Sequence, residues 1–402
     1  MRFVLINQFY PPSEAPTGRL LQNLARKLVS AGHQVKVVAS GDAYNAGANN
    51  TGPHEVLDGV EVLKLGQCSG NRYGIAGKFA RYWSFYAKAR RMVNRLSDNT
   101  DVFLFMTTPP LIGLLGSRLR KYKNKPYILW IMDLYPHALV SAGLIKQSGF
   151  VWQAINRFFK SERANASAII SLGPDMSDLL RGESVEKVVE VPVWSDLVAG
   201  PDAVAQSLEL RRARGWADDE LVLMYSGNMG RAHTFSSFSD LAKLLRSTGT
   251  KARVVACGDG PQKQDWQSAH GTTADFMPIQ PQTDLAAHLL SADIHLISQS
   301  TAWKGVVVPS KFQAACRLGR PVVFAGPSSS SVGRWIREYN AGWVIDPNDQ
   351  LAVAKVAREI SDPSSRATCS ANALKLSKEL FDQEKNLSAI VDLLENAGGV
   401  VP

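Results

Sequence analysis

The chain has 402 residues, of which 45% are hydrophobic, which is enough apolar material for two domains with cores of their own. It contains no run of about 18 uncharged apolar residues, so we expect no transmembrane helix. The net charge of +9 lies entirely in the first half: residues 1–196 hold 24 Lys and Arg against 15 Asp and Glu, whereas residues 197–402 hold 21 of each. This pattern predicts that the first half meets something anionic (phospholipid, a phosphorylated substrate or nucleic acid) or is simply a soluble basic surface.

The N-terminus and the cysteines give no sign of export or of a zinc site. Residues 1–16 lack a long apolar segment and a small-residue cleavage site, so we expect a first strand and a loop instead of a signal peptide. The four cysteines are far apart and have no metal-binding spacing, which predicts a reduced, cytosolic protein without structural zinc; they are Cys68, Cys257, Cys316 and Cys369.

The first elements in the chain form one βαβ unit. A strand at Phe3–Asn7 precedes an amphipathic helix at Arg19–Ala31 and a strand at Gln34–Ser40. No GxGxxG follows the first strand, so a nicotinamide enzyme is not expected. Gly18, at the start of the helix, would let a ligand approach the backbone or is a plain turn glycine. Further elements follow: a loop at 41–59, strands at 60–65, 101–106, 127–132, 168–172 and 188–193, and helices at 111–121, 150–165 and 174–180.

Residues 71–96 are both basic and aromatic, and they contain no acidic residue. An anionic bilayer surface attracts a helix of this kind, although the aromatics could equally pack on the core while the basic groups face water. Single-stranded RNA would use similar residues, but no RNA-binding signature accompanies them, and we expect no nucleic-acid partner. The candidate membrane or acceptor residues are Lys78, Arg81, Trp83, Lys88, Arg90 and Arg91.

Asp133 directly follows the apolar strand expected at 127–132. A carboxylate at the carboxyl end of a parallel strand stands where open α/β sheets bind ligands, and the alternative is a helix N-cap. Residues 197–216 form a linker and a helix, after which a second α/β domain begins with strands at 221–225, 253–256, 273–277, 294–298 and 322–324 and helices at 350–360 and 367–394. We therefore expect two similar-sized Rossmann-like domains facing across a cleft.

Two segments of the second half have the character of anion sites. After the strand at 221–225 comes SGNMGRAH, where Gly227 and Gly230 allow close backbone approach and Arg231 is expected near a helix start. The second segment, residues 306–326, predicts a loop, a short helix, a tight turn and a buried strand.

In this second segment the helix is expected to have Pro309 in its first turn and Ser310 as its cap, and to end at a left-handed Gly319. A helix N-terminus beside the ammonium of Lys311 is typical of a phosphate site, although an ordinary surface turn would have the same pattern.

Taken together, these pieces resemble the retaining glycosyltransferases of the GT-B fold, family four, and more closely the bacterial enzymes that build O-antigen and colanic-acid-type repeat units. The matching segments occur in the expected order: FYPPSEAPTGRL, AGHQVKVV, TTPPLIG, WIMDLYPH, YSGNMGR, CGDGP, VVPSKFQAACRLGRPVVFAG and REYNAGWVI. The resemblance implies an acceptor domain at 1–196, a nucleotide-sugar domain at 197–380, and a C-terminal helix at 381–402 that would pack back towards the first domain.

The resemblance also implies roles for particular residues. Arg231 and Lys311 would neutralise the diphosphate leaving group, and Asp133 would face the sugar or the acceptor. The donor, a UDP-sugar or other nucleotide-sugar carrying a hexosyl or N-acetylhexosaminyl group, would lie near Gly18, Asn228, Gly230, Gly258, Asp259, Gly260, Phe276, Met277, Pro278, Pro309 and Ser310. The acceptor would be a saccharide, commonly one linked to a polyprenyl diphosphate. The enzyme would be cytoplasmic and peripheral on the inner membrane, and neither a cofactor nor a metal is expected.

One departure from the family pattern keeps alternatives open. Many relatives have two glutamates eight positions apart, the second of which binds the ribose hydroxyls, but this chain has Val306 and Ala314 there. A nucleotide-sugar 2-epimerase and a non-catalytic partner subunit with the same architecture are the alternatives. The sequence does not identify the sugar, the nucleotide base, the linkage or the acceptor.

Overall fold

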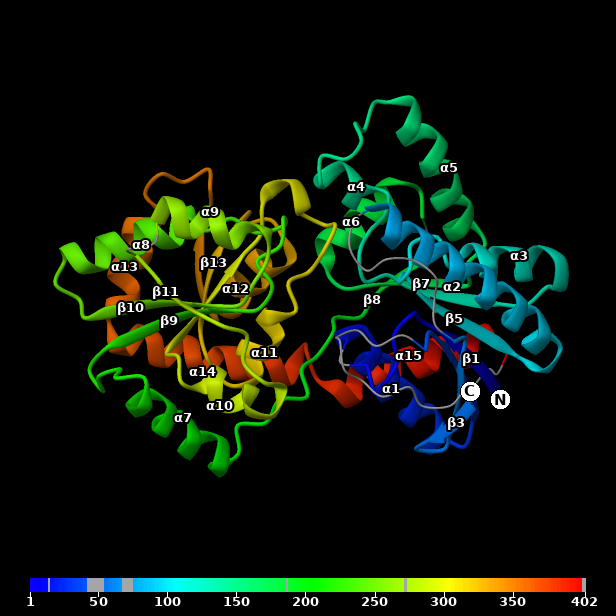
Figure 1. Ribbon diagram of the computed structural model, residues 1–402, viewed down its shortest axis with the longest axis horizontal. Helices are drawn as coiled ribbons and strands as arrows, with labels where there is room; N and C mark the ends of the chain where they lie inside the picture. The colour runs from blue at the N-terminus through cyan, green and yellow to red at the C-terminus, as the bar shows by residue number, and fades with distance from the viewer. Residues whose placement is uncertain (14, 42–53, 67–74, 186, 271–272, 400–402) are drawn as a thin grey trace. The chain divides into compact units, whose positions relative to one another are not determined.

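We describe a computed structural model of the chain, which covers residues 1–13, 15–41, 54–66, 75–185, 187–270 and 273–399. The chain divides into two compact units. The first consists of residues 1–191 and 384–402, and the second of residues 192–383. Each unit is a parallel β-sheet covered by helices (Figure 1). The sequence placed these divisions at 196/197 and 380/381, a few residues away in each case.

The first unit contains an eight-stranded sheet of order β3-β4-β2-β1-β5-β6-β7-β8, parallel except for the β3–β4 pair. The central strands β5 and β6 are buried along their whole length, as expected for strands with helices on both faces. The strands are β1 (Arg2–Ile6), β2 (Gln34–Ala39), β3 (His54–Leu57), β4 (Val60–Lys64), β5 (Val102–Met106), β6 (Tyr127–Trp130), β7 (Ala168–Ser171) and β8 (Val188–Glu190). The helices are α1 (Pro16–Ser30), α2 (Ile75–Leu96), α3 (Leu114–Lys123), α4 (His137–Ser141), α5 (Phe150–Ala164), α6 (Pro174–Gly182) and α15 (Gln383–Ala397).

The strand β3 corrects part of the loop expected at 41–59. It pairs antiparallel with β4 through a two-residue turn at Asp58-Gly59, both of which have positive φ (55° and 78°). Asp-Gly is a strong hairpin signal because both central residues of this turn type need left-handed backbone. Residues 42–53 of the expected loop, and Cys68, lie outside the described residues.

The C-terminal helix α15 packs within the first unit. Lys27 of α1 forms a 2.7 Å ion pair with Glu384, and Nε2 of His33 lies 2.7 Å from a carboxylate oxygen of Glu395. The single helical stretch expected at 367–394 is in fact interrupted after α14, at 380–382. Phe381 is buried there against Phe312 and Trp335, and this anchoring separates the two helices.

The second unit has a six-stranded, all-parallel sheet of order β11-β10-β9-β12-β13-β14. Its strands are β9 (Leu221–Ser226), β10 (Ala252–Cys257), β11 (Asp275–Met277), β12 (Ile294–Ser298), β13 (Val322–Ala325) and β14 (Gly342–Ile345). Its helices are α7 (Pro201–Ala213), α8 (Ser236–Ser247), α9 (Pro261–His270), α10 (Leu285–Leu290), α11 (Lys311–Arg317), α12 (Ser331–Tyr339), α13 (Ala352–Ser361) and α14 (Pro363–Glu379).

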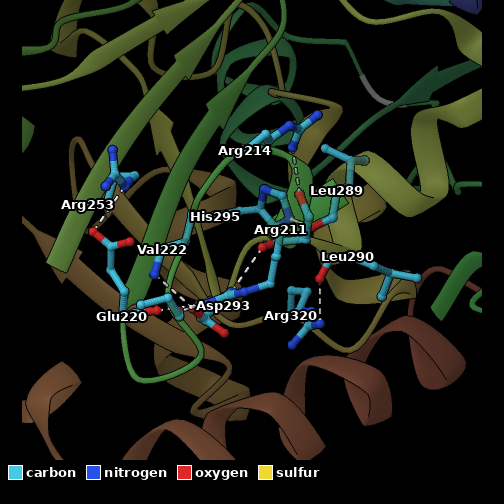
Figure 2. Close-up of polar contacts among 12 residues, drawn as sticks. Arg211, Arg214, Glu220, Val222, Arg253, Leu289, Leu290, Asp293, His295 and Arg320 are labelled. Atoms are coloured by element: carbon cyan, nitrogen blue, oxygen red, sulfur yellow. Dashed lines mark hydrogen bonds and ion pairs between the residues drawn. The ribbon is translucent and has the colours of Figure 1, made fainter. Parts of the chain in front are cut away.

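A buried arginine ties α7 to the amino ends of two central strands (Figure 2). The Nη1 atom of Arg211 donates to a carboxylate oxygen of Asp293 at 3.0 Å, and its Nη2 donates to the carbonyl of Glu220 at 2.8 Å. Asp293, directly before β12, also accepts from the N–H of Val222 in β9 at 2.7 Å. These contacts align the amino ends of β9 and β12 with each other.

Candidate active site

The candidate site is the carboxyl edge of the second sheet, where β9, β10 and β12 are followed by polar loops. The loops after β9 and β10 are held together by backbone hydrogen bonds. Gly227 donates to the carbonyl of Cys257 at 2.8 Å, and Met229 donates to that of Asp259 at 2.8 Å. In the other direction, Gln262 donates to the carbonyl of Met229 at 3.0 Å. The two loops therefore form one rigid rim.

Glycines make this rim possible. Gly227, Gly258 and Gly260 have φ values of +127°, +144° and +143°, which L-residues with a side chain rarely adopt. A Cβ on Gly258 would overlap the carbonyl of Gly227, and one on Gly260 would lie 2.6 Å from the carbonyl oxygen of Met229. At Gly227 a Cβ would collide with the side chain of Lys311. These three glycines therefore serve contacts within the protein, whereas Gly230 has only Nδ2 of Asn228 near it, at 3.5 Å, and close approach of a ligand stays a prediction.

Lys311 places its ammonium at the rim. Its Nζ donates to the phenol oxygen of Tyr225 at 2.7 Å and to the carbonyl of Asn228 at 3.2 Å, and it lies 4.4 Å from the centre of the Tyr225 ring. Desolvation by the surrounding protein lowers the pKa of Lys311 to about 7. Close to neutral pH this lysine is therefore poised to take up a proton when an anion arrives. Tyr225 was not among the residues singled out from the sequence, because a strand tyrosine is read as core.

His233 is a second residue that the sequence did not single out. Its Nδ1 lies 2.7 Å from the carbonyl oxygen of Ser298, at the end of β12. A carbonyl only accepts, so Nδ1 carries the proton. Burial, followed by the nearby Lys311 charge, lowers the pKa of His233 to about 4, so the ring is neutral at pH 7. The Nε2 atom then carries no proton and can accept a hydrogen bond.

Arg231 shares this loop with the carbonyl that accepts from Lys311. Asn228, whose carbonyl binds the Lys311 ammonium, is three residues before Arg231. The Arg231 side chain is exposed, and among the described residues it has no hydrogen bond or ion pair. Arg231 was expected at or near a helix start; it lies in a turn five residues before Ser236, where α8 begins. The turn is closed by a 3.1 Å hydrogen bond from the N–H of His233 to the carbonyl of Gly230.

The helix α11 differs in its first turn from what was expected. It begins at Lys311, so Pro309 lies before it instead of in its first turn. Ser310 occupies the N-cap position with helical φ and ψ, and its side chain makes no capping hydrogen bond. The helical backbone at Ser310 takes the hydroxyl away from the geometry that an N-cap requires. Gly319 has φ +64°, as the left-handed end of this helix requires.

The other residues expected to lie near the nucleotide-sugar are spread along the same edge of the sheet. Gly258 donates to the carbonyl of Met277, at the end of β11, at 3.1 Å, and Pro278 follows as an exposed residue. Phe276 meets Trp266 edge to face at 5.4 Å and is partly committed to the core. The side chain of Asp259 accepts from the N–H of Gly260 at 2.9 Å.

The two positions that differ from the family pattern are apolar and packed. Val306 is buried, and Ala314 packs on the core cluster that includes Leu289, Leu290 and Leu318. No carboxylate from these positions reaches the rim. In the described part of the chain, His, Cys, Asp and Glu form no group of three placed to hold a metal ion.

Asp133 and Gly18 belong to the first unit. β6 ends at Trp130, three residues before Asp133, and α4 begins only at His137, so Asp133 does not cap that helix. Asp133 is exposed, yet the surrounding protein desolvates its carboxyl and raises its pKa to about 6. Gly18, in the first turn of α1, is buried, and a Cβ there would lie 3.3 Å from the backbone of Phe9 and Tyr10. Its missing side chain therefore serves packing within the unit.

The basic candidates lie along α2. Phe79 and Trp83 are 71% and 67% exposed, and Trp83 stacks on Tyr86 at 5.8 Å. Arg90 and Arg91 are exposed, whereas Arg81 and Lys88 are half-buried. The side chain of Lys78 lies outside what the structure describes. Helix α2 thus combines a buried aromatic, Phe85, with an exposed aromatic and basic side, and contact with a bilayer stays a prediction.

Comparison with known proteins identifies the family. Residues 17–194 match the family described as glycosyl transferase 4-like domain, and residues 206–376 match glycosyl transferases group 1. The chain is a family-four glycosyltransferase of the GT-B fold. This glycosyltransferase is similar to a probable glycosyltransferase WbjE of Pseudomonas aeruginosa, with 23% identity over 69% of this chain and 68% of the relative. It is also similar to a putative colanic acid biosynthesis glycosyl transferase WcaI of Escherichia coli K12, with 25% identity over 56% of this chain and 58% of that protein.

Solved structures share the fold of the enzyme. WaaG, described as a glycosyltransferase involved in lipopolysaccharide biosynthesis, superposes with a TM-score of 0.66 at 15% identity and covers 98% of this chain and 99% of its own. Anabaena HepE in complex with UDP and glucose superposes with a TM-score of 0.68 at 14% identity, with the same coverage of both chains. The expected GT-B architecture is thereby confirmed.

Proposed function

We propose that this enzyme is a retaining glycosyltransferase that moves a sugar from a nucleoside-diphosphate sugar to a saccharide carried on a polyprenyl diphosphate, in the synthesis of a cell-surface polysaccharide. The observation that carries the donor assignment is the hydrogen bond from Lys311 to the carbonyl of Asn228, on the loop that also carries the exposed Arg231. Two cations on one glycine-lined rim suit a diphosphate, whose negative charge grows as the bond to the sugar breaks. The solved complex of HepE with UDP and glucose supports a nucleotide-sugar donor.

The positive charge at the rim depends on the protonation of Lys311. Its ammonium is held by the Tyr225 hydroxyl, and desolvation lowers its pKa to about 7. A diphosphate at the rim would stabilise the charged form and raise this pKa again, which concentrates positive charge at the leaving group. We propose that Arg231 and Lys311 together replace a divalent cation, so transfer should persist when a chelator is present. Retention of the anomeric configuration is proposed from the family resemblance.

The acceptor and location are proposed from the first unit. Residues 1–196, most of which belong to this unit, carry the whole +9 excess, which suits a polyprenyl diphosphate and an anionic bilayer. None of the described helices is both long and apolar enough to pass through a bilayer. We therefore propose a peripheral enzyme on the cytoplasmic face of the inner membrane.

The donor assignment can be tested by thermal shift with UDP-, GDP- and dTDP-linked sugars, because a ligand that binds the folded state raises its apparent stability. One nucleotide series should raise Tm in the parent protein, and Lys311→Ala and Arg231→Ala should each abolish that rise. Lys243→Ala is the matched control, since Lys243 is exposed on α8. A normal shift in either rim variant would overturn the assignment.

Turnover separates the remaining hypotheses. The apolar residues at Val306 and Ala314 favour a non-catalytic partner subunit as the second candidate function. Transfer to a polyprenyl-linked saccharide supports the enzyme, and nucleotide binding without transfer supports the subunit. Conversion of the nucleotide-sugar with no acceptor present supports a 2-epimerase.

A further inference from the structure

Helix α5 carries an apolar surface in addition to the one that it buries. Trp152 and Phe159 are buried against the unit, whereas Phe150, Val151 and Phe158 are 83%, 53% and 54% exposed. At about 100° of rotation per residue, these three exposed positions fall within one arc of about 100°. Isolated exposed apolar residues are common, but a contiguous group of large ones marks an interaction site.

The polar side of this exposed face is basic. Arg157 and Lys160, both exposed, lie one helical turn apart beside the apolar arc. The one acidic residue of α5, Glu162, is buried and accepts a 2.7 Å hydrogen bond from the N–H of Gly113. The face is therefore complementary to an anionic partner and has no carboxylate of its own.

A second exposed face of the same character lies close by. Helix α3 packs against both α2 and α5, and Figure 1 shows all three helices in the same part of the first unit. On α2, Phe79 and Trp83 are exposed, and Arg90 follows Trp83 by two turns on the same side. Two helices that both pack against α3 thus each present large apolar side chains next to basic ones.

We propose that the outward face of α5, together with Phe79 and Trp83 of α2, is the surface through which the first unit docks on an anionic phospholipid bilayer. This inference rests on the proposed membrane-linked acceptor and assigns its docking surface. Phenylalanine, tryptophan and valine enter the boundary between headgroups and acyl chains, while Arg157 and Lys160 bind phosphate headgroups. A second copy of the chain suits the face less well, because a twofold contact would bring like charges together.

The test is co-sedimentation of the full chain with vesicles of phosphatidylcholine alone or of phosphatidylcholine mixed with phosphatidylglycerol. The parent should bind the mixed vesicles, and added salt should weaken the binding. Phe150→Ser/Phe158→Ser and Arg157→Glu/Lys160→Glu should each weaken it about tenfold or more. Leu351→Ser/Lys243→Glu is the matched control, since both residues are exposed on the second unit, and it should bind like the parent.

Each outcome decides for or against the surface. Parent protein that ignores mixed vesicles, or α5 variants that bind like the parent, would overturn the proposal. Concentration-dependent self-association that the Phe150→Ser/Phe158→Ser variant abolishes would show instead that the face joins two copies. The thermal shift with nucleotide-sugar should be unchanged in the α5 variants, so a failure at the bilayer is distinguishable from a failure of the donor assignment.

Discussion

The ammonium of Lys311 donates a 2.7 Å hydrogen bond to the phenol oxygen of Tyr225, and that phenol in turn donates to the carbonyl of Asn228, also at 2.7 Å. Tyr225 is completely buried, so it holds the lysine at the rim on a rigid support. A residue that positions a charge in this way contributes to ligand binding without touching the ligand.

Replacing Tyr225 by Phe should therefore weaken nucleotide-sugar binding about threefold to tenfold, the worth of one net hydrogen bond. Titration calorimetry measures this directly. Tyr127→Phe is the matched control, because the Tyr127 hydroxyl donates to the carbonyl of Glu162 in the first unit. Both variants should lose about 1 kcal/mol of stability, but only Tyr225→Phe should lose affinity. Equal affinity in the two would contradict the positioning role.

Binding of a nucleotide-sugar should depend on pH through Lys311. Its pKa is about 7, and a bound diphosphate would raise it, so between these two pKa values binding should take up a proton. The association constant should be flat below about pH 7 and fall by up to tenfold per pH unit above it. Calorimetry in buffers of different ionisation enthalpy should detect the proton uptake at pH 8.

The control for this dependence is Lys311→Arg, whose guanidinium stays charged throughout the range. Whatever affinity this variant retains should be independent of pH between 7 and 9. An unchanged slope in Lys311→Arg would assign the proton to another group. His233 is excluded from that role in advance, because its pKa of about 4 lies well below the range.

The sequence predicted the parallel sheets, but not the contacts that hold Lys311. A run such as VFLFM at 102–106 predicts a buried strand, since a fully apolar strand must be covered on both faces. Lys311 was identified through its neighbours in sequence, whereas its partner Tyr225 is 86 residues away and meets it only in the folded sheet. Pairings over such a distance leave no local pattern, and this is also why His233 was missed.

Smaller errors also have local causes. The β3–β4 hairpin was missed although Asp58-Gly59 signals its turn, because the surrounding Gly, Asn and Asp residues suggested a long loop. The capping role expected for Ser310 failed because the helical backbone extends through it. Residue type suggests a cap, but only the φ and ψ of the folded chain determine whether one forms.

Gly258 should tolerate no side chain. Its φ of +144° is strained for any L-residue, and a Cβ would overlap the carbonyl of Gly227. Gly258→Ala should therefore lower the free energy of unfolding by more than the 1–2 kcal/mol or so of a left-handed alanine alone. Gly249→Ala provides the comparison, since Gly249 has φ +77° but open space around it. Denaturant unfolding measures the free energy of unfolding of both variants, and the extra loss in Gly258→Ala reports the steric overlap with Gly227. Equal losses in the two variants would mean that the loop shifts to make room for the Cβ.

Asp133 should determine how the rate of sugar transfer falls at acidic pH. Desolvation raises the pKa of its carboxyl to about 6, so most molecules carry the charge at pH 7 and lose it as the pH falls through 6. If the carboxylate faces the sugar or the acceptor, kcat/KM should decline about tenfold per pH unit below 6, and Asp133→Asn should lower it by about a hundredfold or more at pH 7.5. The residual activity of Asp133→Asn should not decline in this way below pH 6. Asp349→Asn serves as the control, because Asp349 is an exposed aspartate of the second unit. An acidic limb that survives in Asp133→Asn would assign the titration to a different group.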